Sequence, residues 1–281
     1  MSAMIIGDDS PFLRHPPLHP TESALVDAIR FSIEMADHAY SRLRSSAHTI
    51  SLSQMRKEVL PKNIFAPIFL DAWSVIDSVH RLRKLLESAL LRNRAEVRGF
   101  LPTTRSITDL RDAVQHIDER IEGLADSNLP TWGALAWMFG NLPTDNRAWC
   151  FVMVPGSVRE GRKHLFLKPA GDIRLPVDRL SLTAHRIEVS LSTVIDSVER
   201  LTRILEADII KQGSDLPSNG ADLLLSLEIP WGNNNESYEP GRLTKATLSI
   251  PETARAAIVQ YNIEPPTGGF FSTKLLLTSS L

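Results

Sequence analysis

The sequence contains a single cysteine, Cys150, among 281 residues. An intramolecular disulfide is therefore excluded, and a chain without disulfides is typical of a reducing compartment, so we expect a cytoplasmic protein. No stretch approaches the roughly eighteen apolar residues of a membrane-spanning helix, and the first twenty residues lack the basic and apolar segments of an export signal. The sequence predicts neither a membrane contact nor export.

A strong net charge is also missing. The chain carries 31 Lys and Arg against 33 Asp and Glu, a formal net charge of -2, and its sequence pI is about 6.5. This balance provides no overall attraction to nucleic acid, so any RNA contact must come from a local basic patch. The hydrophobic content of 43% is typical of a globular protein with a sizeable core.

The common signatures of nucleotide, esterase and zinc sites are absent: there is no Gly-rich phosphate loop, no G-x-S-x-G and no HExxH. Carboxylate and imidazole side chains do recur about one helical turn apart, at Glu34/His38, Asp77/His80, His116/Glu119 and His185/Glu188. A di-metal carboxylate bundle needs Glu-x-x-His on two helices, and only Asp77-x-x-His80 approaches that order. A metal-binding helical bundle is therefore kept as a secondary alternative, and we expect no cofactor.

Apolar residues at helical spacing predict three long helices, over about 21–47, 66–93 and 178–212. The first follows an irregular, Pro-containing arm of residues 1–20, with Thr21 as the expected N-cap. The last closes the bundle or builds a dimer. We expect a mainly α (α+β) protein, whose helical domain spans residues 21–212.

The second of these helices has a polar face formed by Asp77, His80, Arg81 and Lys84. Their i, i+3, i+4 and i+7 spacing makes them neighbours on the helix surface. One interpretation is a solvated face with an Asp77–Arg81 ion pair, which would contribute little to stability. The other is a cationic, substrate-binding face beside the next helix.

A further helix is predicted over Ser106–Leu124, with Ser106 as N-cap and Asp109 three residues on. Its apolar residues, at helical spacing, are Leu110, Ala113, Val114, Ile117, Ile121 and Leu124. Arg111 and His116 fall at the two borders of this stripe, about 140° apart on a regular helix. Side chains at such borders are partly buried, and partly buried side chains can take part in catalysis.

The segment RDAVQH, residues 111–116, resembles the Arg-polar-x3-His signature of the HEPN superfamily, with Asp112 in the polar position. The segment 71–86, within the helix predicted over about 66–93, is similar to the long helix that faces the motif in some HEPN-like proteins. The resemblance covers roughly residues 21–212 and implies an antiparallel helical bundle.

By this resemblance, the protein would cleave RNA without a metal, as a toxin or defence protein. His116 would act on the ribose 2′-hydroxyl, Arg111 would stabilise charge on the phosphate, and Asp112 would orient the imidazole. The expected substrate-binding residues are Asp77, His80, Arg81, Lys84 and Arg120. Because Arg111 and His116 diverge on one helix, the hypothesis includes a homodimer, and a toxin would also have an antitoxin or other protein partner.

A non-catalytic interpretation stays open, because HEPN-like bundles also serve as ligand- or protein-binding modules. In that case Arg111 is a surface charge and His116 packs at the border of the stripe. An enzyme needs both side chains exposed in a shared cleft, whereas a scaffold can bury or separate them.

Short strands are expected near Ala148–Val154 and Lys163–Leu167, forming a β-hairpin inserted near 148–168. The aromatic residues Trp132, Trp137, Phe139 and Trp149 predict a satellite core cluster beside it. The hairpin also carries the basic residues Arg159, Arg162, Lys163, His164 and Lys168. Gly and Pro residues near 213–220 mark a boundary, after which residues 221–281 predict a small β-rich unit.

Overall fold

In the computed structural model the described residues are 4–13, 18–61, 63–88, 91–115, 118–119, 130–140, 148–156, 176–212, 225–227 and 246–248. The chain forms two compact units, Met1–Asn219 and Gly220–Leu281. Within the second unit, the described residues are two short antiparallel strands, β5 (Leu225–Leu227) and β6 (Ala246–Leu248).

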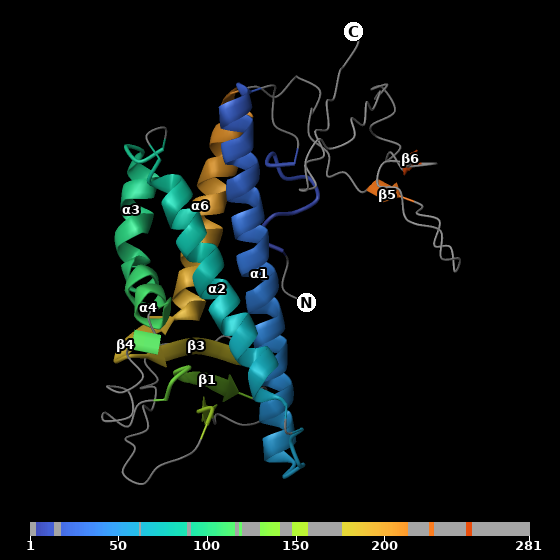
Figure 1. The fold of residues 1–281 in the computed structure, drawn as a ribbon, viewed down its shortest axis with the longest axis vertical. Helices are drawn as coiled ribbons and strands as arrows, with labels where there is room; N and C mark the ends of the chain where they lie inside the picture. The colour runs from blue at the N-terminus through green and yellow to red at the C-terminus, as the bar shows by residue number, and fades with distance from the viewer. Residues whose placement is uncertain are drawn as a thin grey trace, which may run out of the picture. The chain divides into compact units, whose positions relative to one another are not determined.

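The first unit is mainly helical, as predicted. Its described helices are α1 (Pro20–Met55), α2 (Phe65–Leu86), α3 (Ala95–Thr103), α4 (Arg105–Gln115) and α6 (Leu191–Gln212). Figure 1 shows α1, α2 and α6 running alongside one another, with α3 and α4 beside them and a small sheet across one end of the helices. None of the described helices is long and apolar enough to span a membrane.

The N-cap of the first helix lies two residues earlier than predicted. His19, not Thr21, is the N-cap: its Nδ1 accepts a hydrogen bond from the Thr21 N–H, and the Glu22 carboxylate accepts one from the His19 N–H. This reciprocal arrangement is a capping box, and Pro20 suits the first turn because its missing N–H would have no partner there. The helix then continues past the predicted end at Ala47, to Met55.

The sheet is antiparallel, in the order β2-β1-β3-β4, with β1 (Ala134–Gly140), β2 (Ala148–Met153), β3 (Val177–Ala184) and β4 (Ile187–Ser190). The helix predicted over 178–212 is therefore wrong in its first third, which forms β3 and β4. Leu180, Leu182 and Ala184 are buried at every second residue, the period of a strand. His185 and Arg186 both have positive φ, 51° and 70°, and form the tight turn between the two strands.

Two members of the predicted aromatic cluster lie on β1, and they belong to the main core and not to a satellite of it. Trp137 and Phe139 are buried, and the Trp137 Nε1–H donates to Ser51 Oγ on α1 at 2.8 Å. Trp132 lies outside the cluster, with 51% of its surface exposed. The first strand of the predicted hairpin is present as β2, which pairs with β1; its expected partner, the segment 163–167, and the basic residues 159–168 lie outside the described residues.

One hydrophobic core joins the helices to the sheet. Buried residues that contribute to it include Leu43 and Ala47 of α1, Val75, Ile76 and Val79 of α2, Ile107 and Leu110 of α4, Leu135 of β1, Leu182 of β3 and Val198 of α6. The apolar stripes predicted for the helices are therefore the faces that they bury. This packing fixes the sides of α2 and α4 on which the polar residues of interest lie.

Candidate functional site

The side chains predicted to carry chemistry meet where α2 and α4 pack together. We call this region the α2–α4 seam; it comprises Asp77, His80, Arg83 and Lys84 of α2, and Thr108, Arg111 and Asp112 of α4. The α2 residues recur at i, i+3, i+6 and i+7, and the α4 residues at i, i+3 and i+4, so each set lies on one face of its helix. Two arginines tie the helices together across this seam.

The first tie joins Arg111 to Asp77. The Arg111 Nε–H donates to Asp77 Oδ1 at 3.0 Å, and Nη1 donates to Gln115 Oε1 at 2.9 Å. The expected Asp77–Arg81 pair is therefore wrong, because the carboxylate turns toward α4; Arg81 is exposed and pairs with none of the described residues. One quarter of the Arg111 side chain remains exposed, so its guanidinium is both oriented by protein and open to solvent.

The second tie is made by Arg83, a residue that the sequence did not single out. Its side chain is buried and donates to the Leu101 carbonyl, to Thr104 Oγ1 at 2.6 Å and to Thr108 Oγ1 at 3.2 Å. These acceptors flank the junction at which α3 ends and α4 begins. Burial lowers the pKa of Arg83, but an arginine stays charged at working pH. Arg83 therefore sets the position of α4 against α2.

His80 lies between these ties along α2. Of the two interpretations of this face, the solvated one does not hold for His80, because only 7% of its surface is exposed. The face lies beside the next helix, as the other interpretation expected, since α2 packs against α4. Its Nδ1 is buried and has no hydrogen-bond partner among the described residues. Burial lowers the pKa of His80, the charges of Arg111 and Lys84 lower it further, and Asp112 opposes them. His80 is therefore a neutral imidazole at neutral pH.

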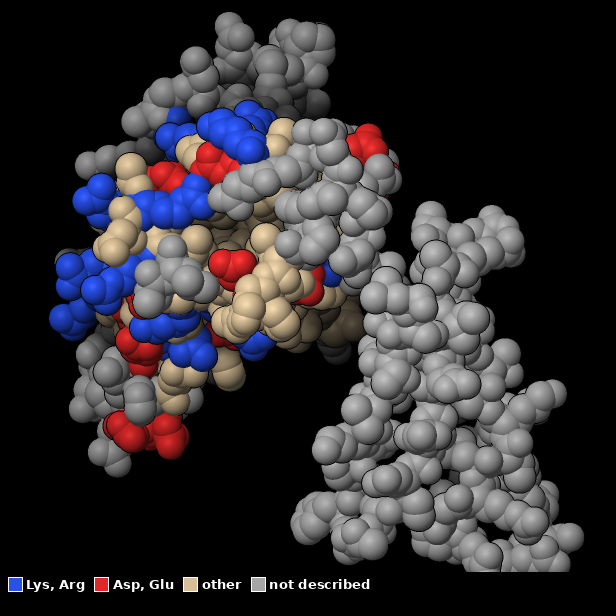
Figure 2. Space-filling view, turned by 90° about the horizontal axis from the view of Figure 1, so that it is seen from above, with Lys and Arg blue, Asp and Glu red and all other residues tan. Residues whose placement is uncertain are grey.

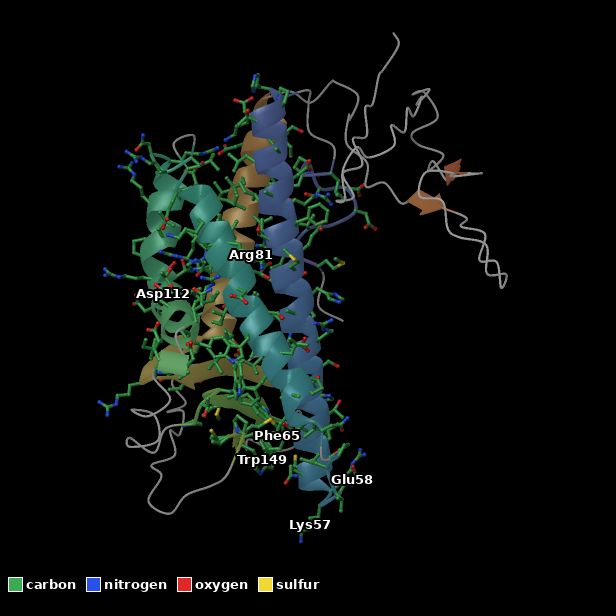
Figure 3. All side chains as sticks on the ribbon, in the orientation of Figure 1. Lys57, Glu58, Phe65, Arg81, Asp112 and Trp149 are labelled. Carbon is green, nitrogen blue, oxygen red and sulfur yellow. The ribbon has the colours of Figure 1, made fainter. Side chains whose placement is uncertain are left out.

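The remaining predicted residues are placed as follows. Asp112 is exposed on α4, and Lys84 is exposed on α2, where it pairs with Glu87 at 3.3 Å. Figure 3 shows Arg81 on α2 and Asp112 on α4, both in the helical layer and away from Phe65 and Trp149 near the sheet. His116 and Arg120 lie outside the described residues. The structure thus brings Arg111 together with Asp77 and His80, and leaves the Arg111–His116 geometry undescribed.

The start of the motif helix differs from the prediction. Ser106 is not its N-cap, because α4 already begins at Arg105, and the one residue between α3 and α4 is the buried Thr104. The Thr104 hydroxyl donates to the Phe100 carbonyl and accepts from Arg83. The predicted buried face is correct within the described part, where Leu110 and Ala113 are buried.

The surroundings of the seam are basic although the whole chain is slightly acidic. Residues 81–112 contain eight Lys and Arg against four Asp and Glu, a local net charge of +4. The exposed cations among them are Arg81, Lys84, Arg92, Arg98 and Arg105. Figure 2 shows Lys and Arg gathered on the side of the molecule where α3 lies in Figure 1. This is a local patch of the kind that an RNA contact would need.

The sequence matches no family model, and no curated protein or solved structure was found to match it. The resemblance to HEPN proteins therefore depends on the residues of the motif and on their helical setting. Within the described part of the chain, no group of three or more His, Cys, Asp or Glu side chains is arranged to hold a metal ion.

The chemistry available at the seam follows from these contacts. Arg111 offers donors that its two described partners do not use, and a guanidinium matches the geometry of phosphate oxygens. Asp77 and Gln115 hold the guanidinium in one orientation, which reduces the entropy lost when a ligand binds. The seam is thus suited to an anion, and the local positive charge favours one.

Proposed function

We propose that this protein is a HEPN-like, metal-independent endoribonuclease that uses Arg111 and His116. The observation that carries the proposal is the state of Arg111: its guanidinium is held by Asp77 and Gln115, remains partly exposed, and lies in a segment with a net charge of +4. Such a side chain is suited to stabilise the charge that develops on a phosphate during cleavage.

His116 would supply the proton transfer. An imidazole titrates near neutral pH, so it can remove the proton from the ribose 2′-hydroxyl, whose oxygen then attacks the adjacent phosphorus. The product carries a 2′,3′-cyclic phosphate, the leaving 5′-oxygen takes up a proton from water, and His116 returns its proton to solvent. Asp112 would orient the imidazole, and Asp77, His80, Arg81, Lys84 and Arg120 would contact the RNA.

The proposal includes a homodimer. On a helix that continued regularly to His116, the two side chains would point about 140° apart, so two copies related by a two-fold axis would combine an arginine from one with a histidine from the other. As a toxin or defence protein, it would also have an antitoxin or other protein partner.

The test is cleavage of a mixed RNA pool in EDTA by the purified full chain, with its oligomeric state measured in parallel. We expect wild-type cleavage that Arg111→Gln and His116→Ala abolish, and products that end in a cyclic phosphate. Arg42→Gln is the matched control, because Arg42 also pairs with an α2 carboxylate, Asp71, but lies outside the seam. A 2′-O-methyl RNA, which lacks the attacking hydroxyl, should bind without being cleaved.

A binding module is the second candidate, and one observation favours it. Asp77 of α2 accepts from the Arg111 guanidinium, as expected for a residue whose role is to join α4 to α2. RNA that binds without cleavage, or cleavage that persists in both the Arg111→Gln and the His116→Ala variants, would favour this function over the nuclease.

A further inference from the structure

His80 is buried with an unused hydrogen-bonding atom in a positively charged seam. Only 7% of the residue is exposed, and its Nδ1 has no hydrogen-bond partner among the described residues. Buried polar atoms are nearly always paired, since a missing hydrogen bond costs free energy, so each exception needs an explanation. A bound ligand that supplies the partner is one such explanation.

The charges around His80 indicate which ligand. Arg111 and Lys84 are the charged groups that act on it most strongly, Arg83 adds to them, and Asp112 opposes. Asp77 also lies one turn before His80 on α2, but its carboxylate is bound by Arg111. Lys84 and Arg83 are both paired with Glu87, and Arg111 with Asp77. The positive charge open to an anion is therefore the part of the Arg111 guanidinium that Asp77 and Gln115 leave unused.

Neutral His80 can donate to an anion because one nitrogen of a neutral imidazole carries a proton. The electrostatic field selects the tautomer as well: an oxyanion beside Nδ1 stabilises the form with the proton on Nδ1. Arg111 can bind the same anion, because its Nη2 donors meet no acceptor among the described residues and a quarter of its side chain is exposed.

We propose that the α2–α4 seam is an oxyanion site in which the Nδ1–H of His80 and the guanidinium of Arg111 bind one phosphate group together. Since Nδ1 itself is buried, binding includes a rotation of the His80 side chain, while Asp77 and Gln115 keep the Arg111 guanidinium in place. The identification of that group as an RNA phosphate rests on the proposed function, whereas the site itself can be tested without RNA.

Sulfate is the probe, because it remains a dianion from pH 5 to 8 and resembles a phosphate group in shape. Imidazole 1H–13C NMR spectra of the full chain are recorded during titration with sodium sulfate, against sodium chloride at equal ionic strength. His80→Gln identifies the His80 signal among the eight histidines. We expect a saturable shift of that signal with sulfate and a raised pKa of His80 in the bound state, because an adjacent anion favours the protonated imidazole.

Two variants make the test specific. Arg111→Gln should weaken sulfate binding about tenfold or more, the loss expected for a hydrogen bond to a charged group. Arg42→Gln removes an equal charge from another α2 ion pair and should change the affinity by no more than about twofold. A His80 signal that responds equally to sulfate and chloride, or equally in wild type and Arg111→Gln, would overturn the proposal.

The outcome is separable from that of the nuclease. Sulfate binding through His80 and Arg111 in a protein that does not cleave RNA would leave the oxyanion site standing and remove the nuclease. Cleavage without any sulfate response of His80 would do the reverse, since the nuclease requires Arg111 and His116 but not His80.

Discussion

The guanidinium of Arg111 and the carboxylate of Asp77 join α4 to α2, with Nε and Oδ1 3.0 Å apart. About half of the Asp77 side chain is exposed, so the pair is worth at most about 1 kcal/mol of stability. Its larger effect is on orientation: with Asp77 and Gln115 both bound, the guanidinium is held in one plane. A ligand that uses the remaining donors meets a prearranged partner.

Asp77→Ala should therefore impair function more than stability. We expect the free energy of unfolding in urea to fall by no more than about 1 kcal/mol, and RNA cleavage to fall by about tenfold to a hundredfold because Arg111 loses its orientation. Asp71→Ala, which breaks the Arg42 pair on the same helix, should leave cleavage unchanged. A loss of stability without loss of cleavage would show that Asp77 is only a structural tie.

Arg83→Met should be among the most destabilising substitutions in this part of the chain. It removes hydrogen bonds to Leu101, Thr104 and Thr108 and leaves buried acceptors unpaired, at a cost of about 2 to 4 kcal/mol. Arg81→Met is the matched control, because Arg81 is exposed and pairs with no described residue; its effect should stay within about 0.5 kcal/mol. Equal values from denaturant unfolding would contradict the role given to Arg83.

The buried imidazole of His80 should make stability depend on pH. The pKa of His80 is lowered below its ordinary value of 6.5, mainly by burial, so the unfolded chain binds this proton more readily than the folded one. The free energy of unfolding therefore falls as the pH drops below about 6.5. Above that pH, the contribution of His80 to stability does not change. His80→Gln should reduce that acid slope, measured by urea unfolding between pH 5 and 8.

His38→Gln, at an exposed position on α1, is the control for losing an imidazole. If the two variants had the same slope, the pH dependence would have to come from other groups.

Asp37→Asn should stabilise the protein at neutral pH. Burial raises the pKa of Asp37, and repulsion by Glu199 adds to this, so the ionised form is unfavourable in the folded chain. Asparagine keeps an oxygen for the Ile5 N–H, which Asp37 binds at 3.0 Å, and removes the buried charge. We expect the melting temperature to rise by about 2 to 4 °C at pH 7, and the gain to shrink as the pH falls toward the raised pKa.

Asp37→Ala lacks the acceptor and should gain less than Asp37→Asn. If Asp37→Asn were destabilising, the ionised carboxylate would have to make a contact that outweighs its burial.

The sequence predicted a helix correctly where the spacing of the apolar residues fits the helical period alone. The stripe of α1, from Ile29 to Leu43, is compatible only with a helix, and it is buried as expected. The spacing of Leu180, Leu182 and Ala184 fits a strand. They were nevertheless assigned to the helix that follows, because its apolar pattern is longer. The turn at His185 and Arg186 contains no Gly or Asn, the residues that usually indicate such a turn, so the start of α6 at Leu191 was not predicted.

The sequence predicted several of the residues of the α2–α4 seam, but not which side chains pair with one another there. Asp77, His80 and Arg111 were identified from their spacing and motif, whereas the partner of Asp77 depends on the side of α2 on which α4 packs, a tertiary contact that no local pattern encodes. Arg83 was missed for the same reason, because a lone arginine near an apolar stripe has no sequence signal until its acceptors, Thr104 and Thr108, are placed beside it.

The most direct test of the account is the affinity of the full chain for a 2′-O-methyl RNA, which cannot be cleaved, measured by fluorescence anisotropy in EDTA at fixed salt. The account predicts that Arg111→Gln raises the Kd about tenfold, while Arg42→Gln, with the same change in charge, leaves it within about twofold. Equal affinities for wild type and Arg111→Gln, in variants that keep their fold, would contradict the claim that the α2–α4 seam binds RNA phosphate.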